Sequence, residues 1–220
     1  MRMNRLAALT VILLSVIADG CLGPTVSGNG HVTTENRDVG GGFSRITLSG
    51  SGRVVIDQGG TESVTVTADD NILSYVKTEV EGTTLVLGQK GGTFMLSPSR
   101  DIVFRVTLRN LDALNISGSG AAELRGFRGS SLNVGISGSG EAAVDGEVED
   151  LRVTVSGSGR FRGEGLQSRR ARVDISGSGG ARVAPRDTLD AIVSGSGFVQ
   201  YVGDPQVHES VSGSGWVRRR

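Results

Sequence analysis

The chain has 220 residues, 37% of them hydrophobic, and its 23 basic residues balance 23 acidic ones. This length suits one domain of ordinary size or two small ones, and a net charge of zero gives no overall field that would attract nucleic acid. Glycine accounts for 35 residues, roughly double the usual share, and aromatic residues make up only 4%. The composition predicts short strands and tight turns, with little helix.

Residues 1–20 are expected to be a lipoprotein-type signal peptide. Two arginines precede an apolar stretch over residues 6–18, which has the length of a signal-peptide core and is short for a membrane span. Cys21 is the only cysteine, so it has no partner for an internal disulfide. We predict that Cys21 is lipidated, although two of the three residues before it differ from the usual lipoprotein motif. The alternatives are an ordinary cleaved signal peptide with an incidental cysteine, or a short uncleaved anchor.

Residues 21–42 are predicted to be a tether. The segment is rich in Gly, Ser, Thr and Asn and shows little apolar periodicity, which is typical of flexible linkers. It would hold the folded part, residues 43–220, away from a membrane surface. The protein is therefore expected to be exported and held at the membrane of the cell envelope through its lipid.

The folded part repeats one short motif. Ser-Gly-Ser-Gly occurs seven times, starting at residues 49, 117, 137, 156, 176, 194 and 212, so that later copies follow one another at intervals of 20, 19, 20, 18 and 18 residues. The residue just before each motif is apolar, and apolar residues recur at alternate positions on both sides of it. Alternation of this kind predicts a strand on each side of a Gly/Ser corner.

A unit of about 19 residues with two such strands predicts an all-β, parallel β-solenoid with one unit per coil. Three short faces and their corners would use about 18 to 20 residues at about 3.3 Å per residue. A propeller blade needs nearer 40 residues. A β-sandwich is the main alternative, but it does not require the Gly/Ser turn to recur at the same position of every repeat. Glycine would permit φ > 0 and close stacking at the corner, and the serine hydroxyls would form a ladder along the rod.

The order of these segments resembles a known family. FSRITLSGSGRVVIDQG, then SVTVTADDNILSYVKTEVEGTTLVLG and a strand ending in LRNLDALNISGSG, precede the serial Ser-Gly-Ser-Gly coils, a pattern similar to the putative auto-transporter adhesin family with the head GIN domain. The likeness covers residues 43–217. It implies a right-handed solenoid, export or lipid anchoring and an adhesive role, and it supplies no catalytic or binding residues to carry over.

The sequence contains few residues of the types that enzymes use for catalysis. His31 and His208 are the only histidines, which leaves little for a His-based triad or a multi-His metal site. We therefore expect a protein that is not an enzyme and that uses no cofactor or metal. Two outward columns carry polar side chains and are interpreted as a solvated face: Asn115, Thr154 and Asp174 in one, and Glu123, Arg162 and Arg182 in the other. Asp69 and Asp70 are interpreted as turn residues.

Phe198 and Trp216 are the candidates for ligand binding. Each lies four residues after the first Ser of its motif, in the last two coils. They could form a small patch on which a sugar stacks, or they could cover the end of the rod, where an open strand edge invites aggregation.

The leading hypothesis is a non-enzymatic envelope protein whose extended face binds a surface polysaccharide or another protein, with no nucleic-acid partner. Two alternatives stay open. One is a polysaccharide-active enzyme whose site lies in the irregular coils of residues 53–110, and it requires a cleft with convergent acids. The other is a structural or sensory module outside the cytoplasm.

Overall fold

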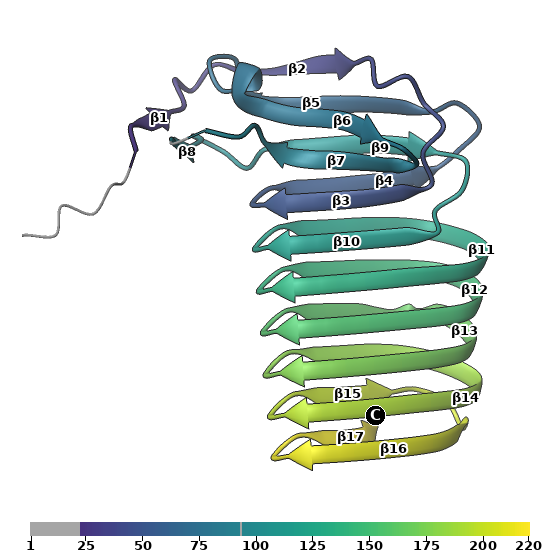
Figure 1. Cartoon of the computed structure of the whole chain (residues 1–220). Helices are drawn as coiled ribbons and strands as arrows, with labels where there is room; N and C mark the ends of the chain where they lie inside the picture. The colour runs from purple at the N-terminus through teal and green to yellow at the C-terminus, as the bar shows by residue number, and fades with distance from the viewer. Residues whose placement is uncertain (1–22, 93) are drawn as a thin grey trace, which may run out of the picture.

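The computed structural model describes residues 23–92 and 94–220. Within these ranges the chain forms strands and a single 3-10 turn, η1 (Leu73–Tyr75), and no helix long and apolar enough to cross a bilayer is found there. In Figure 1 each coil runs to the left along its front, passes behind at a sharp corner and returns to the right, and the next coil begins one level lower, so the coils are right-handed. The predicted parallel β-solenoid is confirmed. The predicted signal peptide and Cys21 lie outside the described residues.

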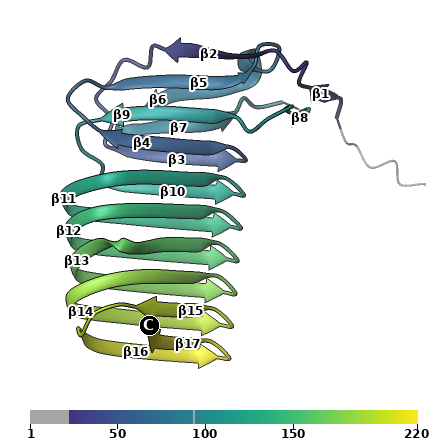
Figure 2. The same ribbon diagram turned by 180° about the vertical axis from the view of Figure 1, so that it is seen from behind.

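Each coil has a front arm that ends at the Ser-Gly-Ser-Gly corner and a back arm that begins there (Figures 1 and 2). In the upper coils the arms are separate strands, and lower down one long strand forms the back arm of one coil and the front arm of the next. The strands of the stack are β3 (Arg45–Gly50), β4 (Arg53–Gln58), β10 (Ala113–Gly118), β11 (Ala121–Gly138), β12 (Glu141–Gly157), β13 (Arg160–Gly177), β14 (Gly180–Gly195), β15 (Phe198–Tyr201), β16 (Gln206–Gly213) and β17 (Trp216–Arg219).

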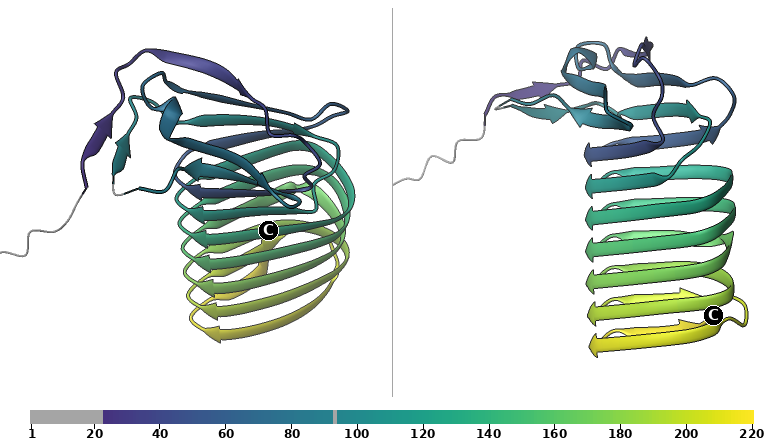
Figure 3. Two further views of the ribbon diagram at one scale, coloured as in Figure 1. Left: turned by 45° about the horizontal axis from the view of Figure 1, so that its top comes forward. Right: turned by 45° about the vertical axis from the view of Figure 1, so that its right-hand side comes forward.

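The cross-section differs from the three faces expected from strand length. Each coil has two arms, one sharp corner and one rounded end (Figure 3, left). The second bend is spread over several residues with register shifts, for example between Leu124 and Phe127 of β11. The ladder of hydrogen bonds therefore continues around this end, and one strand spans both arms.

Successive corners lie directly on one another. Ser117 pairs with Ser137, and Ser156 with Ser176, in unshifted register. Residues of one column therefore stack across the coils, and the apolar columns form a continuous interior. The column before the corner is buried in six of the seven copies, and only Val211 of the last coil is exposed; the buried members are Leu48, Ile116, Ile136, Val155, Ile175 and Val193. This column was predicted to face inward, and the structure confirms it.

The two glycines of a corner meet different demands. Gly157, the first glycine of its corner, has φ of 109°, and a Cβ there would lie 2.7 Å from the carbonyl oxygen of Gly138 in the coil above. At Gly159, the second glycine, a Cβ would lie 2.8 Å from the carbonyl oxygen of Gly140. The first position thus requires both left-handed backbone and space, whereas the second requires space.

Backbone groups connect the corners. The amide of Ser158 donates to the carbonyl of Gly138 at 2.8 Å, and the amide of Arg160 donates to that of Gly140 at 2.9 Å. Among the described residues no corner serine hydroxyl forms a hydrogen bond of the expected ladder. That expectation was wrong, because the serine side chains of the corners point to solvent while the amides face the neighbouring coil.

Residues 59–112 form a cap on the N-terminal end of the stack. Strands β7 (Thr84–Gln89) and β9 (Val103–Leu108) continue the front and back arms in parallel, on β3 and β4. Beyond them the pairing becomes antiparallel, with β6 (Val76–Glu81) on β7 and β5 (Ser63–Asp69) on β9. Ile72 and Leu73, at η1, are buried and close this end of the core.

The prediction of a tether over residues 21–42 was wrong for the part that forms strands. β1 (Thr25–Ser27) pairs with β8 (Met95–Ser97), and β2 (Val32–Arg37) pairs antiparallel with β5. Most side chains of β2 are exposed, so this edge strand has no need of apolar alternation. Backbone pairing holds it in place, and that leaves no signal in the hydropathy pattern.

Asp69 joins the cap to the N-terminal segment. Its carboxylate is fully buried and accepts hydrogen bonds from the Ser99 hydroxyl at 2.6 Å, the Ser99 amide at 2.9 Å and the Gly30 amide at 2.8 Å. The Ser99 hydroxyl is the main cause of the lowered pKa of Asp69. Nearby, the Asn71 side chain donates to the Ser27 carbonyl. Asp69 is therefore a clamp as well as the start of a turn.

Candidate functional site

The two aromatic candidates lie on the outer surface of the back arms. Phe198 and Trp216 are paired across β15 and β17, and their rings stack with centroids 5.1 Å apart. The Arg218 guanidinium lies 5.1 Å from the centre of the Trp216 ring. Gly180 lies next to Phe198 in the coil above, and the Phe198 ring fills the space that a side chain at Gly180 would need. The pair is thus packed within its own column.

These aromatics do not cover the end of the rod. In-register stacking directs the Trp216 ring onto Phe198, and the inward residues of the last coil remain open to solvent. Val211 is 40% exposed, and Glu209, which interrupts the apolar column, is exposed as well. The interpretation of the aromatics as an end cover was therefore wrong.

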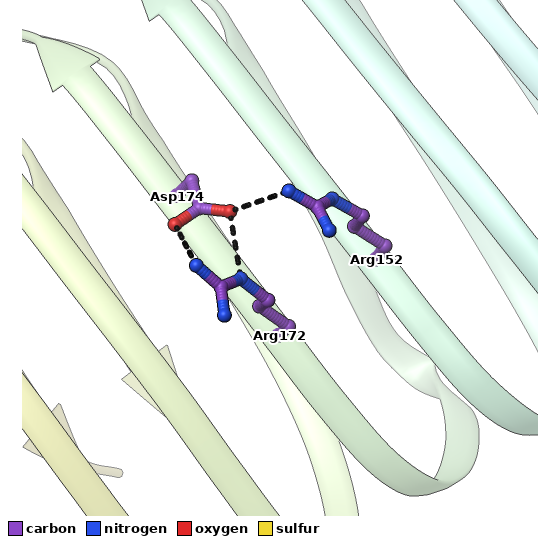
Figure 4. Close-up of polar contacts among 3 residues, drawn as sticks. All are labelled: Arg152, Arg172 and Asp174. Atoms are coloured by element: carbon purple, nitrogen blue, oxygen red, sulfur yellow. Dashed lines mark hydrogen bonds and ion pairs between the residues drawn. The ribbon is translucent and has the colours of Figure 1, made fainter.

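The front arms carry a charged surface in their middle coils. Asp174 pairs with Arg172 of its own strand at 3.2 Å and with Arg152 of the coil above at 3.5 Å (Figure 4). Next to them, the Arg170 guanidinium binds both oxygens of Asp150 and lowers the pKa of that carboxyl group. Asp150 and Asp174 are thus both paired with arginine, and neither is free to act as one of a pair of catalytic acids.

Both predicted polar columns exist. Asn115, Thr154 and Asp174 stack on the front arms, with Gly135 between the first two. On the back arms Arg162 and Arg182 lie below Glu123. Arg162 pairs with Glu141, a residue outside its column. Glu123 pairs with Arg125, so the carboxylates of Glu123 and Glu141 are both engaged by arginine.

A groove runs along the rounded end of the coils. Figure 3 (right) turns this end of the molecule toward the viewer. We call this groove the end groove. It crosses β11, β12, β13 and β14, has a volume of about 490 Å³, and is lined by Arg128, Gly129, Glu147, Val148, Glu149, Gln167, Ser168, Arg169, Arg186 and Asp187. A second depression of about 300 Å³ shares Arg128 and Gly129 with it and continues toward residues 110–112.

The alternation of the strands shapes this groove. Gly129, Val148 and Ser168 pair across successive coils and form a floor of small residues. Long exposed side chains flank the floor on both sides. One wall is Arg128, Glu147 and Gln167, and the other is Glu149, Arg169 and Asp187. Arg186 follows the floor residue Pro185 in β14, and its side chain reaches Gln167. A row of short residues between two rows of long ones leaves a channel parallel to the solenoid axis.

Polar groups of the walls hold one another in position. Arg169 pairs with Asp187 at 2.8 Å, and Arg186 donates to Gln167 at 2.8 Å. The backbone of Arg128 is held by the Gln58 side chain, which accepts from its amide and donates to its carbonyl. Ser168 is buried beneath the floor, in the column of the core residue Val148, and its hydroxyl has no hydrogen-bond partner in the structure. Polar contacts within the walls therefore order the groove, and the Ser168 hydroxyl is not on its surface.

No group of three or more His, Cys, Asp and Glu side chains that could hold a metal ion occurs in residues 23–92 and 94–220. His208 contacts Asp190 at 3.1 Å on the front surface. The backbone of His31 belongs to the clamp region, where its carbonyl accepts from the Asp70 amide. The two histidines thus lie in separate parts of the molecule.

Comparison with known families identifies the chain. The family model described as "Putative auto-transporter adhesin, head GIN domain" matches residues 42–205. The chain belongs to this family. The head GIN domain so defined contains both the cap and the end groove. No curated protein matches the sequence.

Solved structures share the fold of this head GIN domain. A putative adhesin from Bacteroides fragilis has a TM-score of 0.68 at 19% identity, over 89% of this chain and 100% of its own. A putative lipid binding protein from Parabacteroides distasonis has a TM-score of 0.55 at 26% identity, over 89% and 99%. A putative adhesin from the same species has a TM-score of 0.52 at 22% identity, over 89% and 100%.

Sequence reasoning did not find the end groove. Its wall residues lie just before or after the register shifts of the rounded end, between Ala143 and Asp145 and between Gly163 and Gln167. These shifts change the count from the preceding Ser-Gly-Ser-Gly motif, but Arg128, Glu147 and Gln167 each stand nine residues before the first serine of the next motif. A column of long polar residues counted back from the next motif is therefore the signal that could have revealed the groove.

Proposed function

We propose that this head GIN domain is a non-enzymatic binding module of the cell envelope and that the end groove is its binding surface. The observation that carries the proposal is the groove itself, which crosses four coils and has ordered polar walls. A site of this length suits an extended polymer or a protein segment better than a small metabolite. Family membership supports an adhesive role and an exported location, and lipidation at Cys21 would supply the attachment to a membrane.

The charged groups of the molecule favour binding over catalysis. Glycoside hydrolysis uses two carboxyl groups on either side of the bond that breaks, one of them free to give a proton. Here the acids Asp174, Asp150 and Glu141 are each paired with arginine. In residues 53–110, the predicted location of an enzyme site, Asp69 is fully occupied by three hydrogen bonds.

A lipid is a poor fit as the ligand. One solved relative is described as a putative lipid binding protein. A lipid chain needs an apolar cavity, and the interior of this solenoid is filled by stacked columns such as Ile136, Val155 and Ile175, all of them buried. The end groove is polar and open, and it would leave an acyl chain in water.

Sedimentation with isolated cell envelopes tests the proposal. The protein should co-sediment, and the double variant Arg128→Ala/Glu147→Ala should bind at least fivefold less tightly. The matched control is Arg152→Ala/Asp174→Ala, which also removes one positive and one negative group, but from the front arms, and it should bind like the parent. Equal loss in both variants, no co-sedimentation, or release of shortened sugars from the envelopes would contradict the proposal.

A further inference from the structure

The end groove is electrically balanced. Its walls contain the three arginines Arg128, Arg169 and Arg186, and the three acids Glu147, Glu149 and Asp187. Charges of both signs are distributed along the groove, whose coils are spaced by about 4.8 Å. Such an arrangement creates no net field over the groove, so it neither attracts nor excludes a polymer because of the sign of its charge. A strongly anionic or cationic chain would meet as many repulsive as attractive contacts.

The groove also lacks what an extended peptide would need. Peptides that add to a sheet gain most of their affinity from hydrogen bonds with a free strand edge. The strands below the groove are paired on both sides, β12 with β11 and β13, and β13 with β12 and β14. Their backbone groups are already used by the neighbouring coils.

The side chains suit hydroxyl groups. A hydroxyl donates one hydrogen bond and accepts others, and the groove presents both kinds of partner side by side: guanidinium and amide donors, and carboxylate and amide acceptors. The coil spacing of about 4.8 Å is close to the advance per sugar in an extended glycan, so each sugar would meet one new pair of wall residues.

From these features we infer that the end groove binds a neutral, hydroxyl-rich glycan chain that lies parallel to the solenoid axis. This inference rests on the proposed function and names the ligand class for the same site. The groove contains no aromatic side chain, so binding lacks the ring stacking that strengthens many sugar sites. The affinity of a single groove for a short chain is expected in the range of about 0.1 to 1 mM, which clustering on a surface would raise.

Titration with defined oligosaccharides tests this inference. The probes are cellohexaose, xylohexaose and maltohexaose as neutral chains, hexagalacturonate as an anionic chain, and chitosan hexamer as a cationic one. At least one neutral hexamer should bind, and its dissociation constant should change less than about twofold between 0.05 and 0.5 M salt because no net charge is involved. Tighter binding of a charged hexamer with steep salt dependence would overturn the inference.

A pair of wall substitutions gives a readout that a purely structural role would not produce. Arg128→Ala/Glu147→Ala removes two exposed side chains, so it should leave the melting temperature unchanged yet weaken neutral-glycan binding about threefold to tenfold. Arg152→Ala/Asp174→Ala should bind the neutral hexamer as the parent does. Equal affinity of the two variants for the hexamer would contradict the assignment of the groove.

The two proposals fail in different ways. If the protein binds envelopes through the groove but none of the neutral hexamers, and if periodate treatment of the envelopes leaves binding intact while protease treatment removes it, the ligand is a protein and the glycan inference is wrong. The proposed binding function would then stand. If the envelopes are not bound at all, the proposed function itself is wrong.

Discussion

Substitution of a corner glycine by alanine should be far more costly in the middle of the stack than at its top. Gly50 and Gly157 are both first glycines of their corners, with φ of 88° and 109°. A Cβ at Gly50 would meet nothing within 4 Å, whereas a Cβ at Gly157 would lie 2.7 Å from the carbonyl oxygen of Gly138. Gly50→Ala therefore reports the cost of left-handed backbone alone, and Gly157→Ala adds the cost of pushing two coils apart.

The expected magnitudes follow from these two terms. A left-handed conformation costs a residue with a Cβ about 1–2 kcal/mol, and overpacking against rigid backbone adds about 1–3 kcal/mol. For a domain of this size 1 kcal/mol lowers the melting temperature by about 2–4 °C. Gly50→Ala should thus lower it by about 2–8 °C, and Gly157→Ala by about 4–20 °C.

Thermal unfolding followed by circular dichroism and by the fluorescence of Trp216, the only tryptophan, measures both effects. The two probes also show whether the coils below Gly157 melt separately, as neighbour-only contacts permit in a repeat protein. If Gly157→Ala melts at the same temperature as Gly50→Ala, close stacking of the corners contributes nothing measurable, and the reasoning about the second term is refuted.

Three other outcomes are expected. Trp216→Ala should lower the free energy of unfolding, measured in urea titrations, by about 0.5–1.5 kcal/mol because Phe198 loses its stacked partner. The variant should not associate more than the parent does, because the aromatic pair does not cover the strand edge. Hydrogen bonds hold the pKa of Asp69 below its ordinary value of 3.8. The Asp69 carboxylate therefore stabilises the fold fully above about pH 5, and this stabilisation is lost as the pH falls below about 4. Below about pH 4, amide exchange in residues 25–37 should accelerate before exchange in the coils does, and in Asp69→Asn the same amides should exchange fast at pH 7 as well. Metabolic labelling with a fatty-acid analogue should mark the wild-type protein and not Cys21→Ala, and label that survives the substitution would exclude lipidation at this residue.

The regular coils could be predicted because one rule governs them. When coils stack without a register shift, each column repeats one environment, so the apolar residue before every Ser-Gly-Ser-Gly motif already shows which side faces inward. Ile116, Ile136 and Val155 obey this rule. The same rule placed Thr154 and Asp174 in one outward column. Periodicity in the sequence and stacking in space are here the same property.

The rest of the structure depends on contacts that leave no periodic signal. Strand β2 is an exposed edge held by backbone pairing with β5, and the Asp69 clamp joins segments some 30 to 40 residues apart in the chain. At the rounded end, the Phe161 ring fills the space that Gly163 leaves, so one coil needs a glycine where others carry an apolar residue. Such compensations between neighbours are local. The repeat places Arg128, Glu147 and Gln167 in one column, nine residues before the next motif, but the groove between this column and the opposite wall appears only when the coils are stacked.

The identity of the corners also makes rod length adjustable in whole steps. Each internal coil receives the amides of the coil below and offers its carbonyls in the same places, so a coil added between β12 and β13 would find matching surfaces above and below. Every such addition would extend the molecule by about 4.8 Å and add one further rung to the channel at the rounded end. The number of coils thus sets both the length of the rod and the number of contacts that it can make with a long ligand.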